Sequence, residues 1–179
     1  MKTKVTFITL MMIFILGSCF AQETSRKAQR QNAKLERVHQ TEILINSREF
    51  VFTASRALPL GGGSIDLTTN PNYLKFHPDR IESYLPFFGR AYNVDYGGDA
   101  GLKFQGKPKE FKVVNRGKGK GYEINTNVSG KLDNYQINLL VSPEGSATLI
   151  ILSNNRNSIT YFGEIKKMEE RNKEHPEDN

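Results

Sequence analysis

Cysteine is almost absent from this chain of 179 residues, since Cys19 is the only one. A lone thiol cannot close a disulfide within the chain, so a folded domain must be held by its apolar core. Tryptophan is absent, and of the three histidines only His77 lies in the segment that we expect to fold. A common zinc site needs further histidine or cysteine ligands. The sequence therefore predicts no metal site, no cofactor and no catalytic residue.

The chain also has no long hydrophobic run. The longest, residues 5–16, is interrupted by two threonines and falls short of the roughly 20 residues of a membrane-spanning helix. Because Lys2 and Lys4 precede it, the pattern is typical of a secretory signal peptide. If Leu16-Gly17-Ser18-Cys19 acts as a lipobox, residues 1–18 are removed and Cys19 carries a lipid that binds the membrane. Cleavage after Ala21 would instead discard Cys19. The sequence thus predicts export, as an outer-membrane or periplasm-facing lipoprotein or as a soluble periplasmic or secreted protein.

Acidic residues are fewer than basic ones, and the net charge is +6. Outside the cytoplasm, a mild basic excess favours anionic headgroups or acidic glycans as counterparts and disfavours nucleic acid. The densest basic segment has Glu110 as its only acid. Two hypotheses stay open: a basic stripe that meets phosphate-bearing lipids or glycans, and a sheet edge guarded by lysines against aggregation. The residues of this basic segment are Lys103, Lys107, Lys109, Lys112, Arg116, Lys118 and Lys120.

Residues 24–44 contain good helix formers and neither glycine nor proline, which predicts an N-terminal helix or linker. Residues 45–165 show a period of two instead, as in "YEINTNV" and "YQINLLV", which is typical of antiparallel strands covered on one face. Residues 166–179 form a charge-mixed tail that we expect to be disordered. About eight to ten strands follow, enough for one antiparallel barrel-like or curved-sheet domain. We expect them near 48–55, 64–69, 73–77, 81–85 and 101–106, with a meander of about four from 111 to 165.

Three stretches carry a family resemblance: "SREFVFTASRALPLGGG", "NYLKFHPDRIESYLPFFGRAYNVDYGGDAGLKF" and "SITYFGEI". The block "LPFFGRAY" at 85–92 is the most specific. Together they resemble the secreted proteins and lipoproteins of Bacteroidetes that share domain of unknown function 4251, over about residues 25–165. The resemblance implies a lipocalin-like β architecture behind a leading helix, and a place in the cell envelope or outside it. It implies no activity and no catalytic residue.

Aromatic residues are concentrated in "SYLPFFGRAYNVDYGG". They can line a pocket for a small apolar or amphipathic ligand, with Arg90 binding an anionic group, or they can plug one end of a barrel. The first alternative predicts a non-catalytic binding module. The second predicts a structural or interaction protein that docks an envelope partner or inhibits an enzyme, with a filled barrel. A hydrolase is a weaker hypothesis, because no nucleophile–base pair is visible. The candidate ligand-binding residues are Tyr84, Phe87, Phe88, Arg90, Tyr92 and Tyr96.

Overall fold

The structure is a computed structural model that describes residues 26–69, 71–92, 101–130 and 133–168. Cys19 with the predicted signal peptide, Tyr96, and most of the predicted tail lie outside these ranges. The chain divides into two units, residues 1–39 and 40–179, and a helix at 26–47 runs across the division. No helix in the described ranges has both the length and the apolar character of a membrane span.

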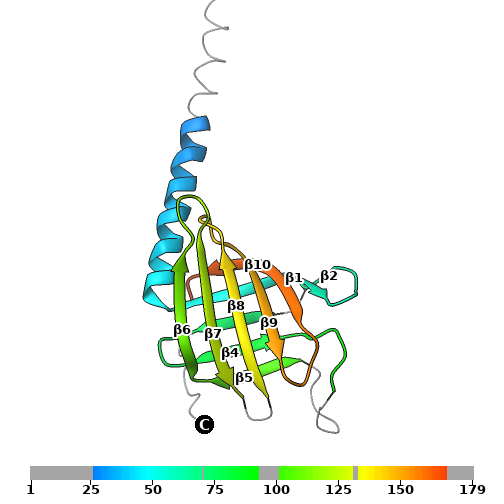
Figure 1. The fold of residues 1–179 in the computed structure, drawn as a ribbon. Coiled ribbons are helices and arrows are strands. Elements are labelled where there is room, and N and C mark those ends of the chain that lie inside the picture. The colour runs from blue at the N-terminus through cyan, green and yellow to red at the C-terminus, as the bar shows by residue number, and fades with distance from the viewer. Residues whose placement is uncertain (1–25, 70, 93–100, 131–132, 169–179) are drawn as a thin grey trace, which may run out of the picture. The chain divides into compact units, whose positions relative to one another are not determined.

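Within the described ranges, ten strands follow the helix, all in the second unit (Figure 1). They are β1 (Phe50–Pro59), β2 (Ile65–Asp66), β3 (Tyr73–Phe76), β4 (Ile81–Leu85), β5 (Leu102–Gly106), β6 (Pro108–Asn115), β7 (Tyr122–Ser129), β8 (Asn134–Val141), β9 (Ser146–Ser153) and β10 (Ile159–Lys166). The predicted meander at the end of the chain has five strands, β6 to β10, instead of about four. The sequence did not predict β6 as a separate strand, because this strand is largely exposed and lacks the alternation of the others.

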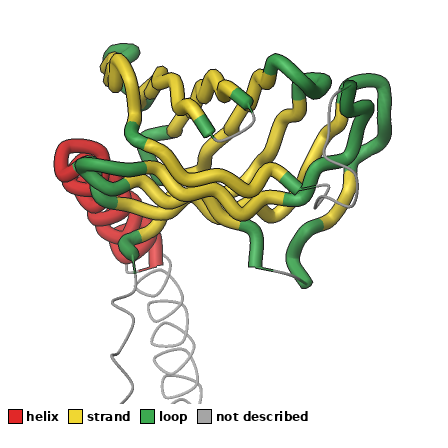
Figure 2. The backbone as a smooth tube through the Cα atoms, turned by 90° about the horizontal axis from the view of Figure 1, so that it is seen from below, coloured by secondary structure: helices red, strands yellow, loops and turns green. Residues whose placement is uncertain are grey.

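One antiparallel sheet contains all ten strands, in the order β5-β4-β3-β1-β10-β9-β8-β7-β6 with β2 beside β1. The two strands at the ends of this order, β5 and β6, follow each other in the chain with only Lys107 between them. Strands β6 to β9 face β1, β4 and β5 and run across them (Figures 1 and 2). The sheet is thus a nearly closed barrel behind one N-terminal helix, which confirms the predicted fold class.

The predicted alternation sets the two faces of the sheet. On β8, Tyr135, Ile137, Leu139 and Val141 are buried, while the residues between them are half-buried or exposed. On β7, Ile124, Thr126 and Val128 point inward in the same way, as their period of two predicts. Strand β9, which is apolar on both faces in the sequence, lies between β8 and β10 and is therefore a central strand of the sheet.

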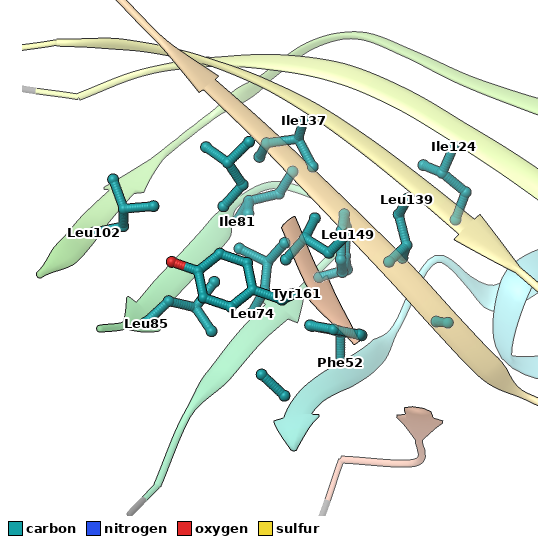
Figure 3. Packing of buried hydrophobic residues seen from close by; sticks show 14 of the residues in the cluster. Phe52, Leu74, Ile81, Leu85, Leu102, Ile124, Ile137, Leu139, Leu149 and Tyr161 are labelled. Carbon is teal, nitrogen blue, oxygen red and sulfur yellow. The ribbon is translucent and has the colours of Figure 1, made fainter. Parts of the chain in front are cut away.

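Large apolar side chains occupy the inner face of the barrel. Figure 3 shows Tyr161 among Leu74, Ile81 and Leu85, and its side chain is fully buried. Its hydroxyl donates a hydrogen bond of 2.6 Å to the carbonyl of Pro86, and burial raises its pKa well above the ordinary value. The rings of Phe104 on β5 and Tyr135 on β8 stack with centroids 3.9 Å apart. These contacts tie the two facing parts of the sheet together.

The last turns of the helix pack at one end of the barrel. Thr41 and Ile45 are buried, and Leu44 packs against the core. Gly145, in the turn between β8 and β9, lies against Thr41, since a Cβ on this glycine would come within 3.2 Å of the Thr41 hydroxyl. The helix residues after Gln40 therefore cover the barrel beside the start of β9.

Candidate functional site

Tyr84, the first of the predicted aromatic site residues, lies on the outer face of β4, because Ser83 and Leu85 point inward. Its ring stacks on Tyr73 of β3 with centroids 5.7 Å apart. The ammonium of Lys103, the partner of Tyr84 on β5, lies 4.2 Å from the centre of the Tyr84 ring. Tyr84 thus belongs to an aromatic and lysine cluster outside the barrel.

Phe87 and Phe88 follow β4 in a loop and pack, partly buried, against the core. This loop is tied to the loop between β9 and β10 by the Arg156 guanidinium, 5.2 Å from the centre of the Phe87 ring. A short antiparallel bridge between Ala91 and Arg156 adds to this link. The two phenylalanines therefore cover the barrel beside the end of β9, opposite the end that the helix covers.

Arg90 and Tyr92 are exposed on the same loop, and the Tyr92 side chain is 71% accessible. Backbone hydrogen bonds of 3.1 Å from Asn157 to Arg90 and of 2.8 Å from Tyr92 to Asn155 hold the loop. The structure thus brings Phe87 and Phe88 together on the core and places Tyr84, Arg90 and Tyr92 at the surface. A ligand site built from these residues and Tyr96 stays a prediction.

The predicted basic residues follow one continuous part of the chain. Lys103 lies on β5, Lys107 links β5 to β6, Lys109 and Lys112 lie on β6, and Arg116, Lys118 and Lys120 lie beyond β6 in the turn before β7. All seven are exposed. Because β6 is the last strand in the sheet order, the placement is compatible with both the basic stripe and the guarded edge, which stay predictions.

A bulge in β6 creates a site that the sequence did not point to. Lys109 pairs with Asn127 and Lys112 with Asn125, so Glu110 and Phe111 together face a single residue of β7. Glu110 has a φ of 54°, in the left-handed region that residues other than glycine rarely adopt. Thr126, the residue opposite, donates its hydroxyl to the Lys109 carbonyl at 3.0 Å. Such bulges redirect side chains and often adjoin functional sites.

A hollow of about 470 Å³ opens at this bulge. We call it the bulge groove. It spans β6, β7 and β8 and is partly open to solvent. Its lining combines side-chain amides with one carboxylate, one ammonium and one aromatic ring. The lining residues are Glu110, Phe111, Lys112, Asn125, Thr126, Asn127 and Gln136.

The three amides of the lining, together with the neighbouring Asn138, form two cross-strand pairs on the outer face of the barrel. Asn125 lies opposite Asn138, and Asn127 opposite Gln136. We call these four residues the amide rows. The carboxylate of Glu123 accepts hydrogen bonds from the side chains of Asn125, at 3.0 Å, and Asn138, at 3.1 Å. Asn138 also donates to the Asn125 carbonyl oxygen at 2.6 Å. These contacts fix one row, while Asn127 and Gln136 stand exposed in the other.

Glu123 stays ionised at neutral pH in this arrangement. The hydrogen bonds from Asn125, and then from Asn138, lower its pKa below the ordinary value of 4.5, with a smaller effect from Arg116 and Lys112. An ionised carboxylate accepts hydrogen bonds only, so both amides must turn their NH₂ groups toward it. The orientation of the Asn125 amide at the groove is thereby set.

The signal for this site was only partly present in the sequence. The outward positions of "EINTNV" and "QIN" carry the amides of β7 and β8, and their cross-strand pairing follows from the short turn between the strands. The bulge could not be predicted from the sequence. Its left-handed residue is Glu110, whereas a left-handed position is usually recognised in a sequence by a glycine. Within the described ranges, no group of three histidine, cysteine or acidic side chains could hold a metal ion.

Comparison with known proteins finds one matching family and a solved structure with a similar fold. The family described as "Domain of unknown function (DUF4251)" matches residues 30–165. The crystal structure of a DUF4251 family protein from Bacteroides eggerthii DSM 20697 is similar, with a TM-score of 0.59 and 22% identity over 76% of this chain and 91% of that chain. This likeness shows the fold alone. None of the curated proteins matches the chain.

Proposed function

The chain belongs to the DUF4251 family, and we propose that it is a non-catalytic binding module that takes its ligand in the bulge groove, outside the barrel. The observation that carries the proposal is the bulge itself. It places a strained Glu110 beside a hollow of about 470 Å³ lined with amide side chains. Small-molecule sites typically measure about 300–1,000 Å³ and carry a few well-placed polar groups.

A ligand inside the barrel has less support. The inner face is occupied by large side chains such as Phe52 and Tyr161. The aromatic residues expected to line an inner pocket are either packed on the core, as Phe87 is, or exposed outside, as Tyr84 and Tyr92 are. We therefore place the binding surface on the outer face and assign the inner face to stability.

The experiment is a titration of the full-length ¹⁵N-labelled protein with the small-molecule fraction of an envelope extract from its host. We expect amide shifts at residues 110–112, 125–127 and 136. Shifts confined to inward residues such as Phe52 and Tyr161 would point to an inner site and contradict the proposal. If no amide moves, the binding function itself fails.

A second candidate function, docking of an envelope partner, is favoured by β6. This strand ends the sheet order, its side chains are mostly exposed, and Lys118 and Lys120 extend the basic segment beyond it. Unpaired strand edges can add a strand from another chain. Cosedimentation with anionic vesicles at low and high salt tests the lipid alternative. Loss of vesicle binding in a Lys118→Ser, Lys120→Ser variant would favour it.

A further inference from the structure

We propose that the bulge groove binds an uncharged, hydroxyl-rich ligand, namely a short neutral saccharide. The inference rests on the proposed function and names the chemical class of its ligand. Three features of the groove argue for this class: the pairing of its amides, the charges of its lining and its polarity.

The amide rows offer donors and acceptors side by side. Each asparagine or glutamine amide carries two N–H donors and a carbonyl acceptor. A sugar hydroxyl is likewise both donor and acceptor, so neighbouring hydroxyls fit one amide. Asn125 and Asn127 are separated by two positions on one strand, which places their side chains on one face about 7 Å apart. That spacing is on the scale of one sugar unit.

The lining of the groove carries charges of both signs in equal number. The lining contains one carboxylate, Glu110, and one ammonium, Lys112. Glu123 adds a negative charge beside the Asn125 amide, and its hydrogen bonds keep it ionised. An anionic ligand would approach two carboxylates, while a cationic one would meet Lys112, the neighbouring Lys109 and Arg116, which is close enough to Glu123 to lower its pKa. The groove therefore favours a ligand without charge.

The polar lining disfavours a purely apolar ligand. The groove is partly open to solvent, and its exposed amides would lose water without gaining partners if an acyl chain lay over them. Phe111 also lines the groove, but its ring packs against the core, edge-on to Phe76 and with the Arg48 guanidinium 5.2 Å from its centre. The hydrogen-bonding groups of the groove therefore come from the amides and not from an aromatic surface. A saccharide keeps the amides hydrogen-bonded, because each hydroxyl both donates and accepts.

The test is calorimetric titration of the full-length protein, purified in a detergent without a sugar headgroup. The probes are four neutral saccharides: maltotetraose, cellotetraose, mannotetraose and tetra-N-acetylchitotetraose. Tetragalacturonate is the anionic comparison. We expect at least one neutral saccharide to bind, and a double variant, Asn127→Ala with Gln136→Ala, to weaken that binding roughly tenfold or more.

The matched control is Gln105→Ala. Gln105 is an exposed glutamine on β5, away from the groove lining, and its replacement should leave binding unchanged. Thermal melts of all variants should overlay, because these side chains are exposed. The inference is overturned if no neutral saccharide binds, if the double variant binds as the wild type does, or if tetragalacturonate binds more tightly. Groove shifts with the envelope extract but none with saccharides would retain the binding module and remove only the saccharide.

Discussion

Tyr161 places a polar atom inside an apolar barrel and satisfies it with one contact. Its side chain is fully buried, and its hydroxyl donates to the Pro86 carbonyl at 2.6 Å. Pro86 is half-buried, so its carbonyl loses part of its hydrogen bonding when the donor is removed. Tyr161 thereby holds the start of the loop that carries Phe87 and Phe88 against the core. One hydroxyl thus stabilises the end of the barrel that these phenylalanines cover.

Tyr161→Phe should lower the free energy of unfolding by about 1 kcal/mol, the net value of a typical hydrogen bond. Urea unfolding followed by circular dichroism measures it. Tyr92→Phe is the control, since Tyr92 also donates a hydrogen bond of 2.6 Å, to Asn157, but is exposed. Its replacement should change stability by less than about 0.5 kcal/mol. Equal losses in the two variants would contradict the role of burial.

Glu123 makes the stability of the folded protein depend on pH in the acid range. Its pKa is lowered in the folded protein by hydrogen bonds from Asn125 and Asn138. A lowered folded pKa adds stability above the unfolded value, and this contribution is lost as pH falls through the folded pKa. Compared with Glu123→Gln, which does not titrate, the wild type should therefore lose relative stability only below about pH 4.5.

Melting temperatures of the two proteins between neutral and acid pH measure this difference, and NMR titration of the Glu123 carboxyl gives its pKa directly. A pKa at or above the ordinary value of 4.5 would mean that the amides do not hold the carboxylate in solution. The orientation of Asn125 at the groove would then lose its basis.

At the scale of the element, the turn between β6 and β7 contains glycines with unequal surroundings. Gly117 and Gly121 both have positive φ, 97° and 77°. A Cβ on Gly117 would meet no atom within 4 Å, while a Cβ on Gly121 would collide with the backbone of Val141 and Ser142. Gly117 is needed only for its positive φ. Gly121 is needed for its positive φ and because it allows the turn to lie against β8.

Gly117→Ala should therefore cost about 1 kcal/mol, from the left-handed backbone alone. Gly121→Ala should cost at least about 3 kcal/mol, because the backbone must also move. Thermal unfolding of the two variants under one condition makes the comparison. Similar melting temperatures would show that the turn adjusts freely and that its contact with β8 adds little stability.

The strands differ in how far the sequence predicts them. Strands β7 and β8 alternate apolar and polar residues because each has one face on the core, so both their existence and their faces could be predicted. Strand β6 is exposed along most of its length, and its pattern therefore carries no period. Its bulge depends on a backbone angle at Glu110 and on the register with β7. Neither is visible in one strand's sequence, which is why the groove was missed.

At the scale of the whole molecule, the aromatic block shows a different limit. The sequence correctly gathers Tyr84, Phe87 and Tyr92 within nine positions, but it cannot say on which side of the sheet each one falls. Ser83 and Leu85 take the inward positions of β4 and so place Tyr84 outside. Clustering along the chain therefore predicts proximity, and only the strand register decides which side chains share a surface.

Attachment to a membrane is a property of the whole chain that intact mass can decide. We expect the protein from membranes of its host to begin at Cys19 and to carry acyl chains, and a Cys19→Ala variant to lack them. Even one acyl chain adds membrane affinity, at about 0.8 kcal/mol per buried methylene. A bare chain that begins at Gln22 would show instead that Cys19 leaves with the signal peptide.

The pairing of β1 with β10 determines when the barrel can close as the chain is synthesised. Every other neighbouring pair in the main sheet joins strands that are consecutive or nearly so along the chain, whereas Phe52 pairs with Ile165. During synthesis β1 appears first and β10 last, so the barrel cannot close until almost the entire chain has been made. Contacts this distant slow folding. Until β10 arrives, the apolar Phe50-Val51-Phe52 edge stays open to wrong partners. The interval before closure is thus when the chain is most vulnerable to aggregation.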